Sequence, residues 1–177
     1  RNESIIFPWI IVNSGERSER ISLIQNQLGD TQKIKLTRSL QQLEYQIMDG
    51  IHKITLTSKP TIAVLTSHQT SENIKIADLL KSLRPYYDSA SFNLKEEGLT
   101  DRKSLENLNQ FDLLLVSNPK EKFTRNEKYI LDQYSLNGGS QFWMLEGLNI
   151  DLKSLFNTKE KTYGFPRDLN LDDYFFN

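Results

Sequence analysis

The chain has 177 residues and carries 22 Lys and Arg against 23 Asp and Glu, which gives a formal net charge of −1. This length is enough for a sizeable core, and the near-neutral charge gives no electrostatic attraction for nucleic acid or an anionic membrane surface. The chain has no Cys, which excludes disulfides, thiolate metal sites and cysteine nucleophiles. It begins with Arg1 and holds Met only as Met48 and Met144, so we expect a processed form or an excised piece of a longer protein.

The N-terminal part of the chain predicts a β-hairpin. Residues 4–12 are the most apolar stretch, and Pro8 within them favours an edge strand or a bulge. Residues 13–15, with the sequence Asn-Ser-Gly, are typical of a turn, and residues 20–24 form the expected returning strand. The stretch is too short to span a membrane and lacks the basic flank and cleavage site of a signal peptide.

A long amphipathic helix is predicted after the hairpin. Its apolar residues recur at spacings of three and four, which predicts one apolar stripe on a helix of about six turns. The stripe consists of Leu36, Leu40, Leu43, Ile47, Ile51 and Ile54. His52 is expected at the boundary of this packed face, and Pro60 ends the helix because the residue before a proline is disfavoured in the α region. We therefore predict an N-terminal element over residues 1–59 that packs on a second, larger unit.

The second unit alternates between short strands and helices. Strands are predicted at 61–65, 86–94, 111–116 and 141–145, and a helix at 71–83. A short helix around Leu105 and Leu108 is capped by Thr100 or Asp101, and Thr124 with Glu127 forms a capping box for the next helix. Strands separated by helices favour right-handed crossovers and a parallel sheet. We predict a three-layer α/β fold with a mostly parallel sheet over residues 60–157, and residues 158–177 as the start of a following segment.

Candidate binding residues follow two of the predicted strands. Ligands of open α/β sheets bind outside the carboxyl ends of the strands. Ser67 and His68 follow the first strand, and Asn118 and Lys120 follow the third. These four residues are the predicted ligand-binding site.

The first of these loops contains no glycine, which argues against a nucleotide site, and no activated nucleophile motif is found. His68 has the pKa range of an acid or base, but a solvated loop histidine is the preferred interpretation. His68 with Glu72 is too weak a pair for a metal site. We expect no catalytic residue, no metal and no cofactor.

Several blocks of the sequence, in the same order along the chain, resemble the GldG family of gliding-motility proteins, which are auxiliary components of ABC transporters. The blocks are Phe7–Trp9, 23–29 (LIQNQLG), 39–45 (SLQQLEY), 62–65 (IAVL), Phe123 with Thr124, 127–134 (EKYILDQY), 137–139 (NGG) and 165–173 (FPRDLNLDD). The resemblance implies an α/β domain similar to one in intraflagellar-transport proteins, of the flavodoxin or amidotransferase type. The amidotransferase nucleophile is a Cys, which this chain does not have, so no catalytic residue is carried over.

The resemblance implies a non-enzymatic, extracytoplasmic binding or scaffold domain involved in gliding motility or associated secretion. The implied partners are the permease and ATPase subunits of the transporter, without nucleic acid, and a homo-oligomer is left open. The implied location is the periplasmic side of the inner membrane, with the membrane tether outside this segment. Two alternatives remain from the residues: a small-molecule or sugar-binding sensor that uses the strand-end crevice, and a degenerate hydrolase in which His68 converges with carboxylates.

Overall fold

A computed structural model describes residues 9–24, 29, 31–71, 74–96, 98, 100–149 and 163–176. The chain divides into two compact units, Arg1–Ser58 and Lys59–Asn177. No helix of the described ranges is both long enough and apolar enough to cross a bilayer. Of the predicted elements and resemblance blocks, residues 4–8 and most of 23–29 lie outside the described residues, as does Glu72.

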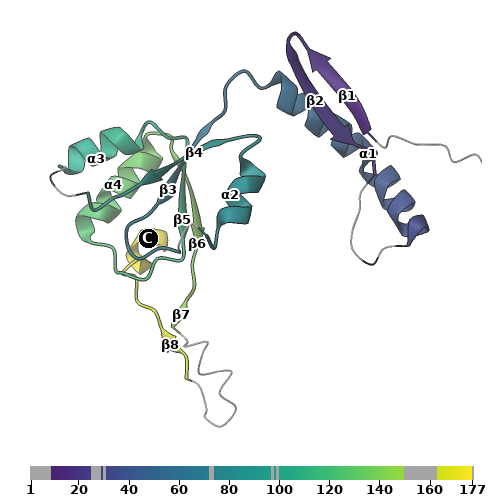
Figure 1. Cartoon of the computed structure of the whole chain (residues 1–177). Coiled ribbons are helices and arrows are strands. Elements are labelled where there is room, and N and C mark those ends of the chain that lie inside the picture. The colour runs from purple at the N-terminus through teal and green to yellow at the C-terminus, as the bar shows by residue number, and fades with distance from the viewer. Residues whose placement is uncertain are drawn as a thin grey trace, which may run out of the picture. The chain divides into compact units, whose positions relative to one another are not determined.

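The first unit consists of a β-hairpin and one helix (Figure 1). Strands β1 (Trp9–Ser14) and β2 (Arg17–Ser22) pair antiparallel in continuous register, which confirms the predicted hairpin, and Gly15 takes a positive φ in the turn. Helix α1 (Gln32–Thr55) begins where the Thr31 side chain accepts a hydrogen bond from the Ile34 N–H. The helix packs against both strands of the hairpin.

The buried face of α1 differs from the predicted stripe. Gly50 and Ile54 are buried, and a Cβ at Gly50 would lie 2.2 Å from Ile21 Cδ1, so glycine permits the close approach of the hairpin. Leu36 and Leu40 are 61% and 64% exposed. The prediction of a wholly packed stripe was wrong for the first turns, because within this unit the hairpin contacts only part of the helix. His52 is also exposed.

The second unit is built on a four-stranded parallel sheet with the strand order β4-β3-β5-β6 (Figure 1). The strands are β3 (Thr61–Leu65), β4 (Asp88–Phe92), β5 (Leu113–Ser117) and β6 (Ser140–Met144). The mixed α/β class and the parallel sheet confirm the coarse prediction. The three strands β3, β5 and β6 begin within two residues of their predicted starts, because continuous apolar runs are typical of parallel strands buried on both faces.

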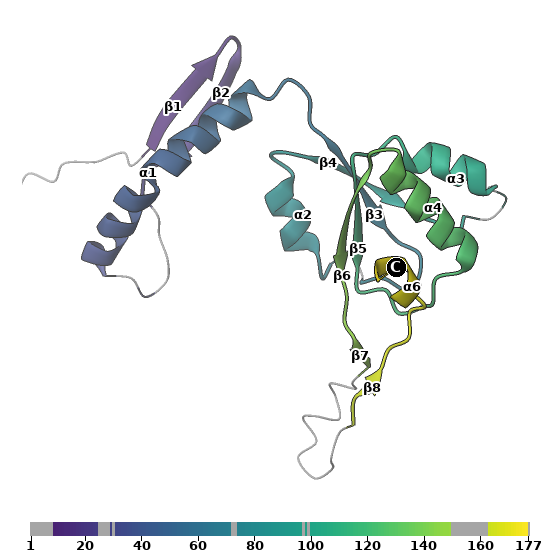
Figure 2. The same ribbon diagram turned by 180° about the vertical axis from the view of Figure 1, so that it is seen from behind.

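Helices cover the two faces of this sheet unequally (Figures 1 and 2). Helix α2 (Ala77–Leu83) lies on one face, and α3 (Asp101–Leu108) and α4 (Arg125–Leu136) lie side by side on the other. Helix α2 starts later than predicted, because the Ser71 N–H donates to the Ser117 carbonyl at 2.8 Å and so belongs to a loop. The capping box of α4 is confirmed, since Thr124 and Glu127 exchange both of its hydrogen bonds.

The end of the described chain belongs to this second unit. Strands β7 (Leu148–Asn149) and β8 (Phe165–Pro166) form a short antiparallel pair, and α6 (Asp172–Phe175) follows. Leu169 and Leu171 are buried in the same core cluster as residues of α3 and α4. The prediction that residues 158–177 begin a separate segment is therefore corrected for its described part, because these two leucines fill the main core.

Candidate functional site

The four predicted site residues all lie at the carboxyl edge of the sheet. Ser67 and His68 follow β3, and Asn118 and Lys120 follow β5, the neighbouring strand. The Lys120 N–H donates to the His68 carbonyl at 2.8 Å. The structure therefore joins the two predicted loops through their backbones.

His68 is buried, with a relative exposure of 1%, so the prediction of a solvated loop histidine was wrong. Its φ is +62° and that of Gln69 is +47°, a left-handed conformation that is uncommon for residues other than glycine. The imidazole stacks on the Phe123 ring, with the ring centroids 3.9 Å apart and the planes 10° from parallel. The reversal of the chain at these two residues is what allows the ring to lie in the core instead of in solvent.

Both ring nitrogens of the buried His68 side chain make polar contacts. His68 Nδ1 shares a hydrogen bond with Ser67 Oγ at 2.9 Å. On the other side, His68 Nε2 lies 3.2 Å from Glu127 Oε2, a contact of ion-pair length rather than a well-aligned hydrogen bond. The same Glu127 oxygen accepts the Thr124 N–H at 2.7 Å. The contacts therefore link the loop after β3 to the N-terminus of α4.

The charge of Glu127 is stabilised by these neighbours. Burial opposes ionisation of this side chain, but the close His68 imidazole and the hydrogen bond from the Thr124 N–H outweigh it and lower the pKa of Glu127 to about 2. A position in the first turn of a helix also favours an acidic residue. Glu127 is therefore ionised over the whole ordinary pH range.

Serine, histidine and a carboxylate in series are the components of a hydrolytic triad. The His68 ring, however, is covered on both faces and edges, with no exposed side-chain surface. A general base must come within hydrogen-bond distance of a substrate proton. In this geometry the series Ser67–His68–Glu127 links the loop after β3 to α4, and its histidine ring has no exposed surface.

Asn118 is also engaged within the protein. Its Nδ2 donates to Glu146 Oε2 at 2.9 Å, and its Oδ1 accepts from Arg167 Nη1 at 2.7 Å. Asn118 has a φ of +46°, the conformation that asparagine tolerates best among non-glycine residues. Arg167 was missed as a member of this site, because 49 residues separate it from Asn118 and only its place in the block 165–173 pointed to it.

The exposed part of the strand-end surface is formed by the loop after β5. Glu121 accepts hydrogen bonds from Lys95 and Gln69, both at 2.7 Å, and these two contacts lower the pKa of Glu121. Lys120 is exposed, and its ammonium forms no hydrogen bond or ion pair with the described residues. Of the four predicted binding residues, Lys120 is thus the one whose charged group remains available to a partner.

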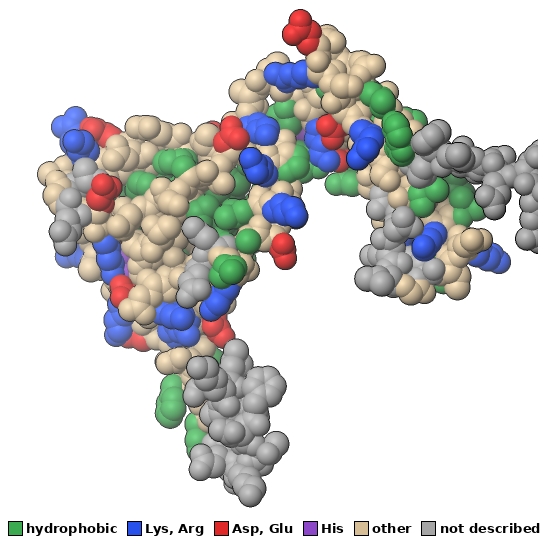
Figure 3. Space-filling model, viewed as in Figure 1, with side chains coloured by type: hydrophobic (Ala, Val, Ile, Leu, Met, Phe, Trp, Pro, Cys, Tyr) green, Lys and Arg blue, Asp and Glu red, His purple; other side chains and the backbone are tan. Residues whose placement is uncertain are grey.

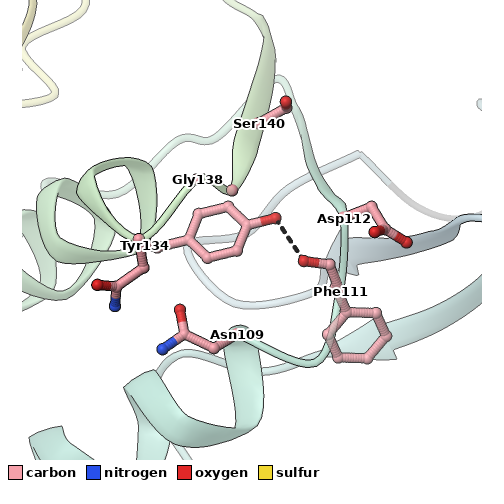
Figure 4. A pocket seen from close by; sticks show the side chains of 8 residues that line it. Asn109, Phe111, Asp112, Tyr134, Gly138 and Ser140 are labelled. Atoms are coloured by element: carbon pink, nitrogen blue, oxygen red, sulfur yellow. Dashed lines mark hydrogen bonds between the residues drawn. The ribbon is translucent and has the colours of Figure 1, made fainter.

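A second concave region lies at the opposite, amino end of the sheet (Figure 4). It is an open polar groove of about 550 Å³. Its lining comprises Asn109, Phe111, Asp112, Tyr134, Asn137, Gly138, Gly139 and Ser140. The Tyr134 hydroxyl donates to the Phe111 carbonyl at 3.0 Å, and burial together with the nearby Asp112 carboxylate raises the pKa of Tyr134 to about 12. Tyr134 is therefore a neutral structural donor in this groove.

The two glycines of this groove have structural roles at the end of α4. Gly138 has a φ of +95°, and the Gly139 N–H donates to the Tyr134 carbonyl at 2.9 Å. A Cβ at Gly139 would lie 2.2 Å from the Tyr134 ring. Gly138 and Gly139 therefore end α4, and the missing Cβ of Gly139 leaves room for the Tyr134 ring.

The comparison with protein families decides the identity of the larger unit. A family described as an ABC-type uncharacterized transport system, the auxiliary ABC-transport family, matches residues 59–177. The chain belongs to this auxiliary ABC-transport family. The match begins where the second compact unit begins.

Other comparisons add little to the family assignment. A solved structure, the mmIFT52 N-terminal domain, shares 22% identity with a TM-score of 0.41, covering 60% of this chain and 53% of that one. The chain thus spans about half of that neighbour. No curated protein matches the sequence. Membership of the auxiliary ABC-transport family indicates an accessory role beside the components of a transporter.

Proposed function

We propose that this chain is a non-enzymatic binding or scaffold part of a GldG-type auxiliary subunit, located on the extracytoplasmic side of the membrane. The family match over residues 59–177 is the observation that supports this proposal most directly. Its partners are the permease and ATPase subunits of the same transporter, and its process is gliding motility or associated secretion. The colinear blocks that resemble GldG support this finer assignment.

The surface we propose for the partner is the exposed strand-end loop that carries Lys120. Ser67 and His68 lie beneath this loop, and the His68 carbonyl holds its backbone in place. Asn118 fixes its other end through Glu146 and Arg167. In this proposal Lys120 contacts the partner, whereas Ser67, His68 and Asn118 are positioning residues.

Binding of the purified chain to the detergent-solubilised permease–ATPase complex of its own organism tests this assignment. We expect saturable binding that K120E weakens, with K103E, at an exposed position of α3, as the matched charge control. Absence of binding, or equal weakening by both substitutions, would contradict the proposed surface.

A reporter enzyme that is active only outside the cytoplasm, fused to the chain in its full natural protein, tests the location. Loss of colony spreading on deletion of the coding region tests the process.

A second candidate function is binding of a small polar molecule, and the groove in Figure 4 favours it. The side chains of Asn109 and Asn137 there form no hydrogen bonds with the described residues. A ligand at 100 times its dissociation constant adds about 2.7 kcal/mol to the stability of a protein. In a thermal-shift screen with monosaccharides and amino acids, a compound that binds in the groove should raise the melting temperature of the chain. The same compound should not raise the melting temperature of N109D. If no compound raises the melting temperature, the second candidate function is contradicted and the scaffold function remains.

A further inference from the structure

The outer edge of β6 carries backbone groups that no described residue pairs. Strand β6 is the last strand of the sheet, and among the described residues it pairs only with β5. The Ser140 N–H donates to Asp112, and the Met144 carbonyl accepts from Asn118, so these residues face β5. Because backbone groups alternate in direction along a strand, the N–H and C=O groups of Gln141 and Trp143 face outward.

This edge lacks the features that usually prevent strands from pairing with another chain. Its five residues, Ser140 to Met144, include no charged residue and no proline, and the register with β5 is continuous, without a bulge. The opposite edge strand, β4, begins instead with Asp88 and is polar over most of its length. The two edges of the sheet therefore differ in their capacity to accept a further strand.

An apolar surface accompanies the open edge on the face that carries α2. Phe142 is 51% exposed and lies beside Leu115 of β5. It borders a groove of about 220 Å³ whose other walls include Leu79 and Leu83 of α2, and the lining is almost entirely apolar. Hydrophobic side chains reach the surface of this unit among interspersed charges in Figure 3. An incoming strand would cover this surface together with the edge.

The other face of β6 is held rigidly. The Gln141 side chain donates to the Leu131 carbonyl at 2.7 Å and to the Tyr174 hydroxyl at 2.8 Å. The Trp143 ring packs against the rings of Phe123 and Phe175, with centroids 5.4 and 5.3 Å apart. The strand is thus fixed in an extended form before any partner arrives, which reduces the entropic cost of pairing.

We propose that the outer edge of β6 pairs with β6 of a second copy of this chain, antiparallel and centred on Phe142. In this register Gln141 of one copy lies opposite Trp143 of the other and exchanges both backbone hydrogen bonds with it. Phe142 then lies opposite its counterpart as a non-hydrogen-bonded pair, the position in which side chains of antiparallel strands approach most closely. The two sheets become one continuous sheet, and the two apolar grooves lie side by side on one face.

A second copy fits this edge because the strand is complementary to itself. A two-fold axis at Phe142 brings the residues nearest to it close to their own equivalents, so a charge near the axis would repel its copy. Strand β6 has no charge to be repelled, and aromatic residues opposite each other stabilise antiparallel pairs. The proposal does not depend on the transport role, since it rests on the edge and on its side chains alone.

Sedimentation of the whole chain over a range of concentrations tests the association. We expect a monomer–dimer equilibrium in the wild type, and we expect F142K to raise the dimer Kd by roughly tenfold or more by placing like charges at the axis. The control is L136K, which changes an equally apolar, 72% exposed residue at the end of α4. Circular dichroism confirms that each variant is folded. A wild type that stays monomeric at all concentrations, or a dimer that F142K leaves intact, would overturn the proposal.

Cross-linking tests the register, because the chain has no cysteine of its own. F142C should form an intermolecular disulfide under mild oxidation, since opposed non-hydrogen-bonded residues meet the roughly 4.4–6.8 Å Cα separation that a disulfide needs. L136C should remain largely reduced. A mixture of S140C and M144C should cross-link more than either variant alone. Equal cross-linking of F142C and L136C would refute pairing between copies. The proposal would also be refuted if the edge of β6 bound an added synthetic β-strand peptide while the chain itself stayed monomeric.

Discussion

The buried contact between His68 and Glu127 provides the sharpest test of how the strand-end region is stabilised. His68→Ala removes the stacking on Phe123 and the hydrogen bond with Ser67, and it leaves the Glu127 carboxylate without its buried partner. All three changes lower the free energy of unfolding of the second unit.

The size of the effect follows from the electrostatics of Glu127. The lowering of its pKa from 4.5 to about 2 corresponds to roughly 3 kcal/mol of native-state stabilisation of the carboxylate, to which His68 makes the largest single contribution and Thr124 adds further ones. Removing one member of a buried pair typically costs about 3–5 kcal/mol, because the remaining charge stays desolvated. We therefore expect His68→Ala to lower the free energy of unfolding by about 2–4 kcal/mol at pH 7.

The measurement is urea unfolding followed by Trp143 fluorescence in a W9F background, so that the only remaining tryptophan reports on the second unit. The matched control is His52→Ala, which removes the other histidine, exposed on α1 of the first unit. A loss below 1 kcal/mol in His68→Ala, or an equal loss in His52→Ala, would refute the stabilising role of the pair.

The pH dependence gives a second readout of the same contact. Glu127→Gln keeps a side chain that suits a capping box but removes the charge. The pKa of Glu127 is lower in the folded than in the unfolded state, so the carboxylate stabilises the fold fully above about pH 5 and loses this contribution as the pH falls toward 2. The stability difference between wild type and Glu127→Gln should therefore shrink as the pH falls below about 4.5. A difference that does not change with acidification would contradict this reasoning.

Three further substitutions test local packing in the second unit, each by urea unfolding at pH 7. Gly139→Ala places a Cβ 2.2 Å from the Tyr134 ring and should cost about 1–3 kcal/mol, whereas Gly147→Ala, with no atom within 4 Å, should cost less than about 1 kcal/mol. Tyr134→Phe removes the hydrogen bond to the Phe111 carbonyl and should cost about 1 kcal/mol; an unchanged midpoint would mean that water replaces the hydroxyl. Thr124→Ala removes the N-cap of α4 and should cost about 1 kcal/mol, more than Lys120→Ala, which should stay within about 0.5 kcal/mol.

The parts of the fold that the sequence predicts well are those set by local pattern. Strands β3, β5 and β6 are apolar runs, and α4 has the Thr124–Glu127 capping box at its start. These features depend on neighbours in the sequence, so a single sequence contains them. The short strands β7 and β8 have two residues each and no periodicity, and they were not predicted.

The candidate site was predicted in its position but not in its internal contacts. The rule that loops gather at the carboxyl ends of parallel strands placed Ser67 and Asn118 correctly at one edge. The burial of His68 depends instead on the positive φ of two non-glycine residues and on Phe123, which comes 55 residues later in the chain. A histidine in a polar loop gives no periodic signal of that outcome, and neither does a glutamate whose visible role is to cap a helix.

A single glutamate thus connects helix capping with the shape of the strand-end surface. Glu127 closes the capping box that starts α4, and the same carboxylate holds the His68 ring against Phe123. The His68 carbonyl in turn accepts a hydrogen bond from the Lys120 N–H, and this bond orients the exposed loop. A substitution at Glu127 should therefore weaken the binding of a partner at Lys120, even though the Glu127 side chain is buried. Weaker partner binding by Glu127→Gln than by Thr124→Ala, at equal loss of stability, would distinguish this route from general destabilisation.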